Sequence, residues 1–438
     1  DAARAMKGCN SAVESGKESG VDGQRFAIGG RVVDADDPQL QDLLAQAYEA
    51  PGRPRCLCVA GGVEMYVAFH RHFQIKRMPE TGDRHHPACP SYEPGPAMSG
   101  LGELVGEAVV QLDPARVELH VDFPWARVPG RAGVSREPAE PAEVGRTRRR
   151  MSLRALMHFL FERAGFNRWS PAMAGKRNQA VLHKYLMQAA EAIRVKGEPL
   201  SNRLYVPEAF SETAKAEQAD RRRARLSVLQ PHDGRQPLAV VLGEFKGWES
   251  APAGARIWIR HMPDAPLLAD ARTWARVQRG FAPLFEALDS DGGRGLRLML
   301  AALIRARREH TYEIDLASLM LTSEEWIPLE GVHEAPLVRA LVAQGRRFVK
   351  PLRYDARTAA GVANAILLDA GAEPVPLHVM SAFMTPIEAE AKDRAIAQAG
   401  GRSWAWSAVG PMPNLPEATG RRASKIGSDG SEHRSKAS

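Results

Sequence analysis

Apolar residues recur at two different spacings in the first hundred residues, and each spacing predicts a type of element. Alternating apolar and polar positions in Val63–Phe69 and Phe73–Lys76 predict a β-hairpin that turns near residue 71. A shorter apolar stretch, Arg25–Val33, predicts one strand. Leucines three and four residues apart in Pro38–Glu49 predict a helix with a proline near its start.

The middle of the chain has the helical spacing. Apolar positions after Ser152 predict a helix that this serine caps. A second helix is predicted at 176–195, and a strand at Leu200–Val206.

Beyond residue 210 the apolar runs become longer. Leu238–Phe245 and Arg256–Arg260 predict paired strands, Ala271–Leu288 predicts helix, and Tyr312–Leu321 predicts another strand. Leu296–Ile304 is apolar along most of its length, which fits either a strand or a helix, because periodicity does not separate the two.

The last unit has the clearest pattern: helix, strand, strand, strand, helix, strand. Its helices are predicted at His333–Gly345 and Pro386–Ala399. The second strand is nearly all apolar, so we expect both of its faces to be buried. The four strands are predicted at Arg347–Leu352, Val362–Leu368, Pro374–Ser381 and Arg402–Ser407.

Composition narrows the class of protein. The chain has 438 residues, of which 44% are hydrophobic and 25% charged, and this is typical of soluble protein with more than one domain. The sequence contains no run of about 18 apolar residues, so no membrane-spanning helix is predicted. The first residues lack the apolar core of a signal peptide. We therefore expect a cytoplasmic protein that does not contact a membrane. The net charge of +7 is consistent with a polyanion partner such as DNA or RNA, and equally with the arginine usage of a GC-rich genome.

Three of the four cysteines lie close together in the sequence. Cys56 and Cys58 are two residues apart, so in an extended chain both side chains face one side, about 7 Å apart at Cα. His85 and Cys89 are four residues apart, and the predicted hairpin can bring the two pairs together. In a reducing compartment such a cluster favours metal binding over disulfides. Thiolates and imidazoles in a tetrahedron are what Zn²⁺ prefers.

The predicted zinc site is closed, because four protein ligands leave no position for a substrate. It is therefore expected to be structural rather than catalytic. His86 is the alternative to His85, since two adjacent side chains do not easily reach one ion. Two other interpretations stay open: three buried thiols without a metal, and a redox role for Cys56 and Cys58.

Basic residues gather at two places in the helical middle. Arg148, Arg149 and Arg150 end a basic run, and Lys176 and Arg177 begin the second helix. Two helices followed by a strand, with basic residues on the second helix, resemble the layout of a winged helix, which predicts nucleic-acid contact. An ordinary helical subdomain is the alternative.

The order of elements in the last unit resembles the core of the PD-(D/E)XK nucleases. The resemblance implies carboxylates that hold Mg²⁺ and a lysine that stabilises charge on the phosphate. It assigns these roles to Glu334, Asp369 and Lys392. His378 stands where the third strand is expected to carry an acidic ligand, and imidazole is a poor ligand for Mg²⁺. A degenerate unit is therefore favoured, with an active endonuclease and an unrelated α/β unit as alternatives.

Several motifs are specific enough to point to a family: Cys56-x-Cys58, His85-x3-Cys89-x-Ser91-Tyr92-Glu93, Gly243-Glu244-Phe245-Lys246 and Lys350-Pro351-Leu352-Arg353-Tyr354-Asp355. With them the chain resembles, over about residues 25–410, a bacterial family called domain of unknown function 1173. The resemblance implies a clustered-cysteine module, carriage on plasmids or integrative elements of proteobacteria, and partners among other proteins of such elements. It implies no established activity.

We therefore expect a multidomain α+β protein with a zinc-ribbon-like β-hairpin module, a helical middle, a central β-containing region and an α-β-β-β-α-β unit. The predicted function is a non-catalytic, zinc-binding, nucleic-acid-associated accessory protein of a mobile genetic element. A metal-dependent nuclease and an interaction scaffold with a structural zinc are the alternatives. The predicted boundaries are 1–24 (disordered tail), 25–95 (zinc-binding module), 96–150 (strand and linker), 151–210 (helical, winged-helix-like), 211–330 (α/β), 331–416 (nuclease-like) and 417–438 (disordered basic tail).

Overall fold

The computed structural model describes residues 24–127, 149–356 and 359–419. The chain divides into two compact units. The first runs to Pro96 and includes Val110–Glu118, and the second comprises Ala97–Val109 and the chain from Leu119 onward. Helices and several sheets are both present, so the α+β class is confirmed. The predicted linker lies outside the described residues, as do most of the two predicted tails.

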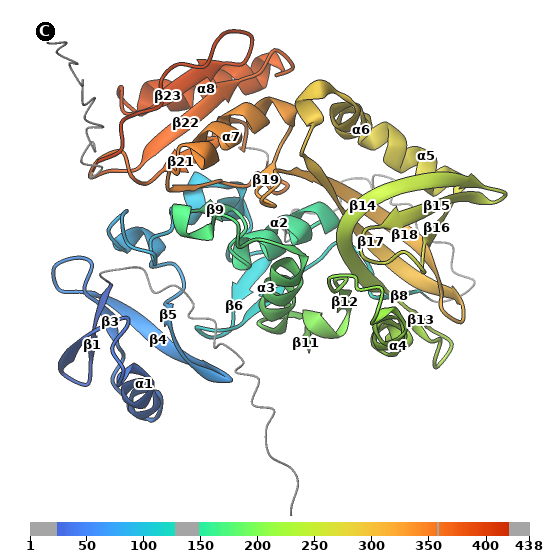
Figure 1. Cartoon of the computed structure of the whole chain (residues 1–438), viewed down its shortest axis with the longest axis horizontal. Coiled ribbons are helices and arrows are strands. Elements are labelled where there is room, and N and C mark those ends of the chain that lie inside the picture. The colour runs from blue at the N-terminus through green and yellow to red at the C-terminus, as the bar shows by residue number, and fades with distance from the viewer. Residues whose placement is uncertain (1–23, 128–148, 357–358, 420–438) are drawn as a thin grey trace, which may run out of the picture. The chain divides into compact units, whose positions relative to one another are not determined.

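The first unit is a five-stranded sheet with one helix, α1 (Leu40–Glu49). In Figure 1, α1 packs against β1, β4 and β5. The predicted hairpin is confirmed, since β4 and β5 are antiparallel and only Arg71, with φ 64°, separates them. The strands, in their order across the sheet, are β2 (Arg31–Asp34), β1 (Arg25–Ile28), β3 (Arg55–Cys56), β4 (Val63–His70) and β5 (His72–Arg77).

The single strand predicted at Arg25–Val33 was wrong, because this stretch forms a hairpin. β1 and β2 are antiparallel and are joined by Gly29 and Gly30, with φ of 55° and 82°. Positive φ at two successive residues is the pattern of a tight hairpin turn, which glycine adopts without strain.

Two helices form the middle of the chain, α2 (Leu153–Arg163) and α3 (Gln179–Glu191). The predicted cap is confirmed, because Ser152 Oγ accepts a hydrogen bond from Ala155 N at 3.2 Å. The second helix is shorter than predicted, since β10 (Ile193–Val195) follows α3 and pairs with β11 (Glu198–Pro199).

Five strands of the second unit close into a ring, visible on the right of Figure 1. Around the ring β14 pairs with β15, β15 with β16, β16 with β18, β18 with β17, and β17 with β14. The β16–β18 pair is parallel and the other four are antiparallel. The strands are β14 (Ala239–Ala251), β15 (Gly254–Ile259), β16 (Leu267–Asp270), β17 (Arg297–Arg308) and β18 (Thr311–Thr322).

The ring closes because β14 is long and bent. Its first part, up to Glu244, pairs with β17, and the part from Phe245 onward pairs with β15. A bulge between Phe245 and Gly247 separates the two parts, and bulges bend a strand and increase its twist. Leu296–Ile304, left open between helix and strand, belongs largely to β17.

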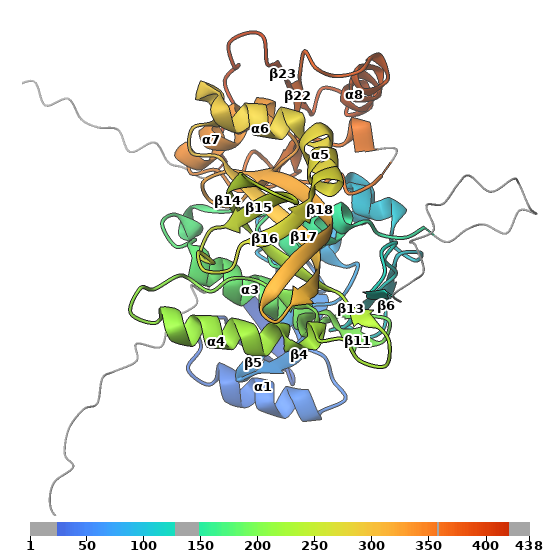
Figure 2. The same ribbon diagram turned by 90° about the vertical axis from the view of Figure 1, so that its right-hand side faces the viewer.

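Two helices lie between β16 and β17, α5 (Ala271–Gly280) and α6 (Ala282–Asp289). Both contact strands of the ring and lie above it in Figure 2. From α5, Trp274 and Val277 join the same apolar cluster as the ring residues Ile257 and Leu300. The α5 helix therefore covers the core of the ring.

The last part of the second unit, from α7 to β23 and here called the C-terminal unit, has the predicted order of elements. Its sheet runs β23–β22–β21–β20–β9, with β22 and β23 parallel and the other neighbours antiparallel. A capping box of Thr385 and Glu388 begins α8. The elements are α7 (Ala335–Ala343), β20 (Phe348–Val349), β21 (Ala365–Leu367), β22 (Val375–Met380), α8 (Pro386–Gln398), β23 (Trp404–Ser407) and, from the helical middle, β9 (Arg168–Trp169).

The predicted boundaries near residues 210 and 330 are not boundaries between separate cores. One buried apolar cluster extends from Trp169 to Trp406 and includes the inner residues of the ring. The α2 helix contacts β17 and β18, and β12 (Leu204–Tyr205) pairs in parallel with β14. The segment 151–210 is therefore part of the second unit, and not a free-standing winged helix.

The remaining elements connect these parts. β6 (Val109–Gln111) and β7 (Val117–Leu119) lie where the two units meet in the sequence, and α4 (Lys215–Leu226) follows β12. Two short strands, β8 (Ala126–Arg127) and β13 (Gln236–Pro237), pair with each other, and β19 (Pro328–Leu329) pairs with β18. None of the helices in the described part of the chain has the length and apolar character needed to cross a bilayer.

Closure of the ring predicts a strict need for glycine at residue 254. Gly254 has φ of +144°, and a Cβ atom there would lie 2.1 Å from the carbonyl oxygen of Ala269 on β16. We expect Gly254→Ala to lower the free energy of unfolding by about 2 kcal/mol or more, measured by urea denaturation. Gly280→Ala is the matched control, because a Cβ atom there has nothing within 4 Å. Equal stability of the two variants would contradict this account.

Candidate functional site

The three clustered cysteines and His85 come together in the first unit. Cys56 is the last residue of β3, and Cys58 lies in the turn before β4. Gly61 and Gly62, with φ of 75° and 65°, complete this turn. His85 and Cys89 belong to the loop after β5, where Cys89 N donates a hydrogen bond to the carbonyl of His86 at 2.7 Å.

The distances suit a tetrahedral ion. Cys56 Sγ and Cys89 Sγ are 3.7 Å apart. His85 Nδ1 lies 3.3 Å from Cys58 Sγ and 3.8 Å from Cys89 Sγ. All four atoms are within 4.8 Å of one another. A regular tetrahedron with Zn–S bonds of about 2.3 Å separates two sulfurs by about 3.8 Å, so the group can hold a metal ion.

Hydrogen-bond donors surround the sulfurs. His86 N donates to Cys58 Sγ at 3.5 Å, and Ser91 N donates to Cys89 Sγ at 3.4 Å. The Gln24 side-chain amide is 3.5 Å from Cys56 Sγ, although the sequence predicted a disordered tail up to this residue. Donors of this kind stabilise thiolates and orient metal ligands.

The thiols are also electrostatically unequal. The pKa of Cys56 is lowered to about 3, chiefly because the Cys89 thiol donates a hydrogen bond to its sulfur. The same bond, followed by burial, raises the pKa of Cys89. Burial raises the pKa of Cys58. A metal cation would favour the thiolate form of all three cysteines, which is the form that binds metals.

Of the two adjacent histidines, the structure brings His85 to the cysteines. His85 is 3% exposed, and its other ring nitrogen, Nε2, has no hydrogen-bond partner in the described part of the chain. His86 is exposed, and its Nδ1 accepts a hydrogen bond from Ala88 N at 3.1 Å. His85 is therefore the ligand that the geometry favours.

Two of the four predicted catalytic residues meet in the C-terminal unit, where Asn364 joins them. Asn364 donates to Glu334 Oε1 and accepts from Lys392 Nζ and, at 2.8 Å, from Val379 N. The Glu334 carboxylate also forms an ion pair with Lys350, with 3.0 Å between Oε2 and Nζ. All four linked side chains are buried.

Burial sets the charges of this buried network, defined as Glu334, Lys350, Asn364 and Lys392. Burial alone would raise the pKa of Glu334, but the Lys350 ammonium holds it below its usual value. Burial lowers the pKa of Lys392 to about 7, against the opposing effect of Glu334. A carboxylate whose two oxygens are already bonded to ammonium, amide and backbone N–H groups has little capacity left for Mg²⁺.

Asp369 does not join Glu334 and Lys392. It follows β21, whereas Asn364 precedes β21, so the two lie at opposite ends of this strand. Arg346 Nη2 donates to Asp369 Oδ1 at 2.8 Å, and Arg347 N donates to Oδ2 at 2.8 Å. The assignment of Asp369 to a shared catalytic site therefore needs correction: its carboxylate ties Arg346 in place.

His378 lies on β22 and is 3% exposed. Its pKa is lowered to about 4 by burial, and its Nδ1 has no partner among the described residues. Over the same residues, the only group of three or more cysteine, histidine or acidic side chains arranged for a metal is the cysteine cluster. No set of ligands for Mg²⁺ is therefore seen around His378 in this part of the chain.

The sequence reasoning did not assign roles to Lys350 and Asn364. Lys350 follows β20 and is the first residue of a recognised motif, and Asn364 directly precedes the apolar strand β21. The sequence did contain a signal for the buried network: a lysine and an amide stand at the ends of apolar strands. Such groups are rarely buried without polar partners.

The five residues predicted to contact nucleic acid have four different outcomes. Arg148 lies outside the described residues, and Arg150 and Lys176 are exposed. Arg149 forms an ion pair with Glu103. Arg177 needs correction: it is half-buried, and its guanidinium donates to the backbone carbonyls of Gly165, Phe166, Arg168 and Glu325. Burial lowers its pKa to about 10, so it supports the fold.

Fold and site thus define an α+β protein with a Cys₃His cluster able to hold a metal ion. The family described as "Protein of unknown function (DUF1173)" matches residues 26–409, and the chain belongs to this family. No curated protein and no solved structure matches the chain.

The buried network predicts a strong coupling between Glu334 and Lys350. We expect Glu334→Gln to lower the free energy of unfolding by about 3 kcal/mol, because it leaves buried ammonium groups without a counter-charge. The double variant with Lys350→Met should recover about 2 kcal/mol of this loss in urea denaturation. Glu390→Gln is the control, since its side chain is 73% exposed. Simple additivity of the two single effects would refute the coupling.

Proposed function

We propose that the protein is a nucleic-acid-binding accessory protein of a mobile genetic element, which a zinc ion stabilises and which does not cut its ligand. The observation that carries this proposal is the closed ring of five strands in the second unit. The cysteine cluster supports the stabilising zinc ion, and the buried network supports binding without cleavage.

The ring has the order of an OB-fold barrel. The third and fifth strands along the chain, β16 and β18, are parallel neighbours, and α5 and α6 stand between the third and fourth. Barrels of this class bind oligonucleotides or oligosaccharides on their second and third strands and nearby loops. The similar strand order supports oligonucleotides or oligosaccharides as the ligand class. Binding itself depends on the side chains that the barrel presents.

Strand β15 offers suitable side chains on the outer face of the ring. Ile257 and Ile259 are fully buried in the core, so Arg256 and Trp258 lie on the opposite face, because side chains alternate along a strand. Arg256 is exposed and Trp258 half-buried. An aromatic ring beside a cation is the usual means of stacking unpaired bases without sequence preference.

The cysteine cluster supports a structural zinc. Three thiolates and one imidazole are a common ligand set for Zn²⁺, and they leave no open position on the ion. The ligands connect β3 to the loop that contains His85 and Cys89, so the ion would cross-link the first unit.

The buried network supports binding without cleavage. Glu334 is paired with Lys350, and the residue before β21 is Asn364 rather than an acid. Lys350 therefore already neutralises the carboxylate that the nuclease alternative assigns to a metal ion.

The zinc proposal predicts about one equivalent of zinc in purified protein. We expect Cys56→Ser, Cys89→Ser and His85→Ala to lose the metal and to lower the melting temperature. His86→Ala is the matched control, which should keep the metal and the melting temperature. Elemental analysis and calorimetry measure the two quantities. Absence of metal from the unmodified protein, or equal loss in His86→Ala, would overturn the assignment.

The ligand proposal predicts that single-stranded oligonucleotides bind, with an affinity that falls about tenfold between 50 and 200 mM salt. We expect Trp258→Ala to weaken binding about tenfold in fluorescence anisotropy, because a stacked base is lost. Phe383→Ala is the control, since this residue is 90% exposed and lies in the C-terminal unit. No binding at low salt would refute the proposal. Mg²⁺-dependent cleavage that Glu334→Gln abolishes would favour the nuclease alternative.

A further inference from the structure

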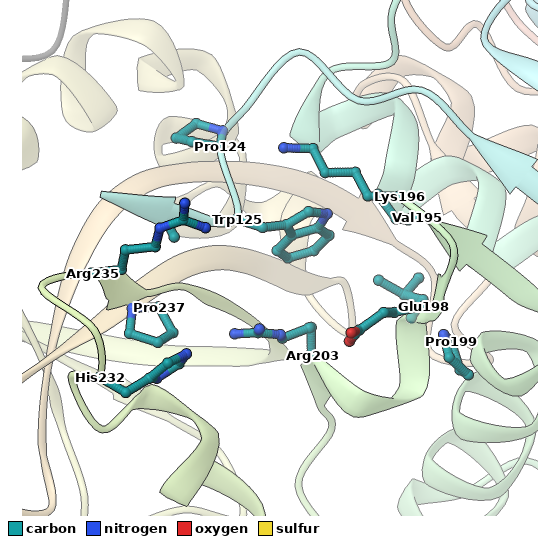
Figure 3. Close-up of a pocket in the computed structure, with 12 residues that line it drawn as sticks. Pro124, Trp125, Val195, Lys196, Glu198, Pro199, Arg203, His232, Arg235 and Pro237 are labelled. Carbon is teal, nitrogen blue, oxygen red and sulfur yellow. The ribbon is translucent and has the colours of Figure 1, made fainter. Parts of the chain in front are cut away.

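A pocket of about 420 Å³ lies in the second unit, at the end of the ring where β14 begins (Figure 3). The segment with Trp125 meets β14 there, because Leu238 N donates to the Trp125 carbonyl at 2.9 Å. Gln236 Nε2 donates to the Ala306 carbonyl on β17 at 2.7 Å. The pocket is therefore attached to the barrel that carries the proposed function.

The charged side chains of this pocket are mostly basic. Lys196, Arg203 and Arg235 line it, and Glu198 is the only carboxylate among its lining residues. No carboxylate forms an ion pair with any of the three cations within the described ranges. By contrast, Arg221 and Arg222 of α4 are both paired with acids. Unpaired cations around a concave site favour an anionic ligand.

Two tight turns hold two of the three cations, Lys196 and Arg235, in place. Lys196 and Gly197, with φ of 53° and 81°, connect β10 to β11. Asp233 and Gly234, with φ of 49° and 66°, make a similar turn, which Arg235 closes by donating its N–H to the His232 carbonyl at 2.8 Å. Asparagine, aspartate and glycine suit such turns. A lysine in the left-handed conformation costs about 1 kcal/mol. This cost suggests that the charge of Lys196 serves a function at this position.

The wall of the pocket is apolar. Trp125 is 9% exposed and packs edge-on against Phe123, with ring centroids 5.4 Å apart. In Figure 3 its indole lies between Arg235 on one side and Lys196 and Glu198 on the other, above Arg203. Its Nε1 is buried and has no acceptor in the described part of the chain. The site therefore combines cations with an aromatic wall.

We propose that this pocket binds one nucleotide, with its phosphate between Arg203, Arg235 and Lys196 and its base on the Trp125 side. Arginine suits phosphate because its planar donors match the phosphate oxygens. The volume lies in the lower part of the range of ligand pockets, which suits one nucleotide rather than a length of strand. The nucleotide is either free or the 5′-terminal residue of a single strand. The second source rests on the proposed function of the barrel.

Calorimetric titration of the full chain tests the pocket with four probes: inorganic phosphate, dTMP, and a dT oligonucleotide with and without a 5′-phosphate. We expect dTMP to bind, at a Kd on the order of 100 µM, and phosphate to bind at least about tenfold more weakly. The double variant Lys196→Asn/Arg235→Gln should weaken dTMP binding about tenfold or more. Because asparagine suits the left-handed position, this variant should fold at least as stably as the unmodified protein.

Arg272→Gln/Arg276→Gln is the matched control, since it removes the same charge from exposed positions on α5. It should leave dTMP binding unchanged. Preference for the 5′-phosphorylated oligonucleotide, lost in the pocket variant, would identify the strand end as the source. Equal oligonucleotide affinities with intact dTMP binding would identify the free nucleotide.

Three results would overturn the pocket assignment: no dTMP binding, dTMP bound no better than phosphate, or an equal loss in the α5 control. None of these results refutes the barrel proposal if the oligonucleotides still bind and Trp258→Ala still weakens their binding. Loss of all oligonucleotide binding with dTMP binding intact would instead refute the barrel proposal and keep the pocket.

Discussion

The pairing of β14 with two neighbours on successive halves of its length is the constraint on which the second unit depends. β17 pairs with its first half and β15 with its second, so the strand must bend at the bulge by Gly247. Once it bends, β16 and β18 meet through Leu268 and Glu313, and the ring is closed. Closure removes the exposed edges that an open sheet would leave for aggregation. It also fixes the end of β14 where Trp125 and Arg235 line the pocket.

The two clusters of polar side chains in this protein satisfy their charges by opposite means. In the first unit, three thiols and His85 converge, and a metal cation would balance the negative charge of the thiolates. In the C-terminal unit, the cation is already part of the chain, because Lys350 meets Glu334 and Lys392 meets Asn364. Removing one member of such a buried set costs several kcal/mol, whereas the intact set contributes little net stability. The lysines therefore supply the positive charge that the buried Glu334 carboxylate needs.

Local patterns were predictable from the sequence, and distant pairings were not. The cysteine cluster was found because its ligands lie within two short segments joined by one hairpin, whose turn at Arg71 the alternation indicated. The order of the C-terminal elements followed from periodicity in the same way. The ring was missed because its closing pairs, such as Ala239 with Ile304, join residues far apart in the chain. Apolar alternation sets which face is buried but does not identify the partner strand.

Asp369 shows why a correct element order still gave a wrong site. The position of Asp369 after a buried strand matches the nuclease motif. It does not show whether the other predicted site residues lie at the same end of the sheet. Glu334 and Lys392 both extend to Asn364 at the start of β21, while Arg346 holds Asp369 beyond its end. Only four residues separate Asn364 from Asp369, three of them in β21, yet the two ends of the strand carry separate networks. Assigning chemistry to a fold therefore requires the direction of each strand relative to the helices, which only the tertiary contacts supply.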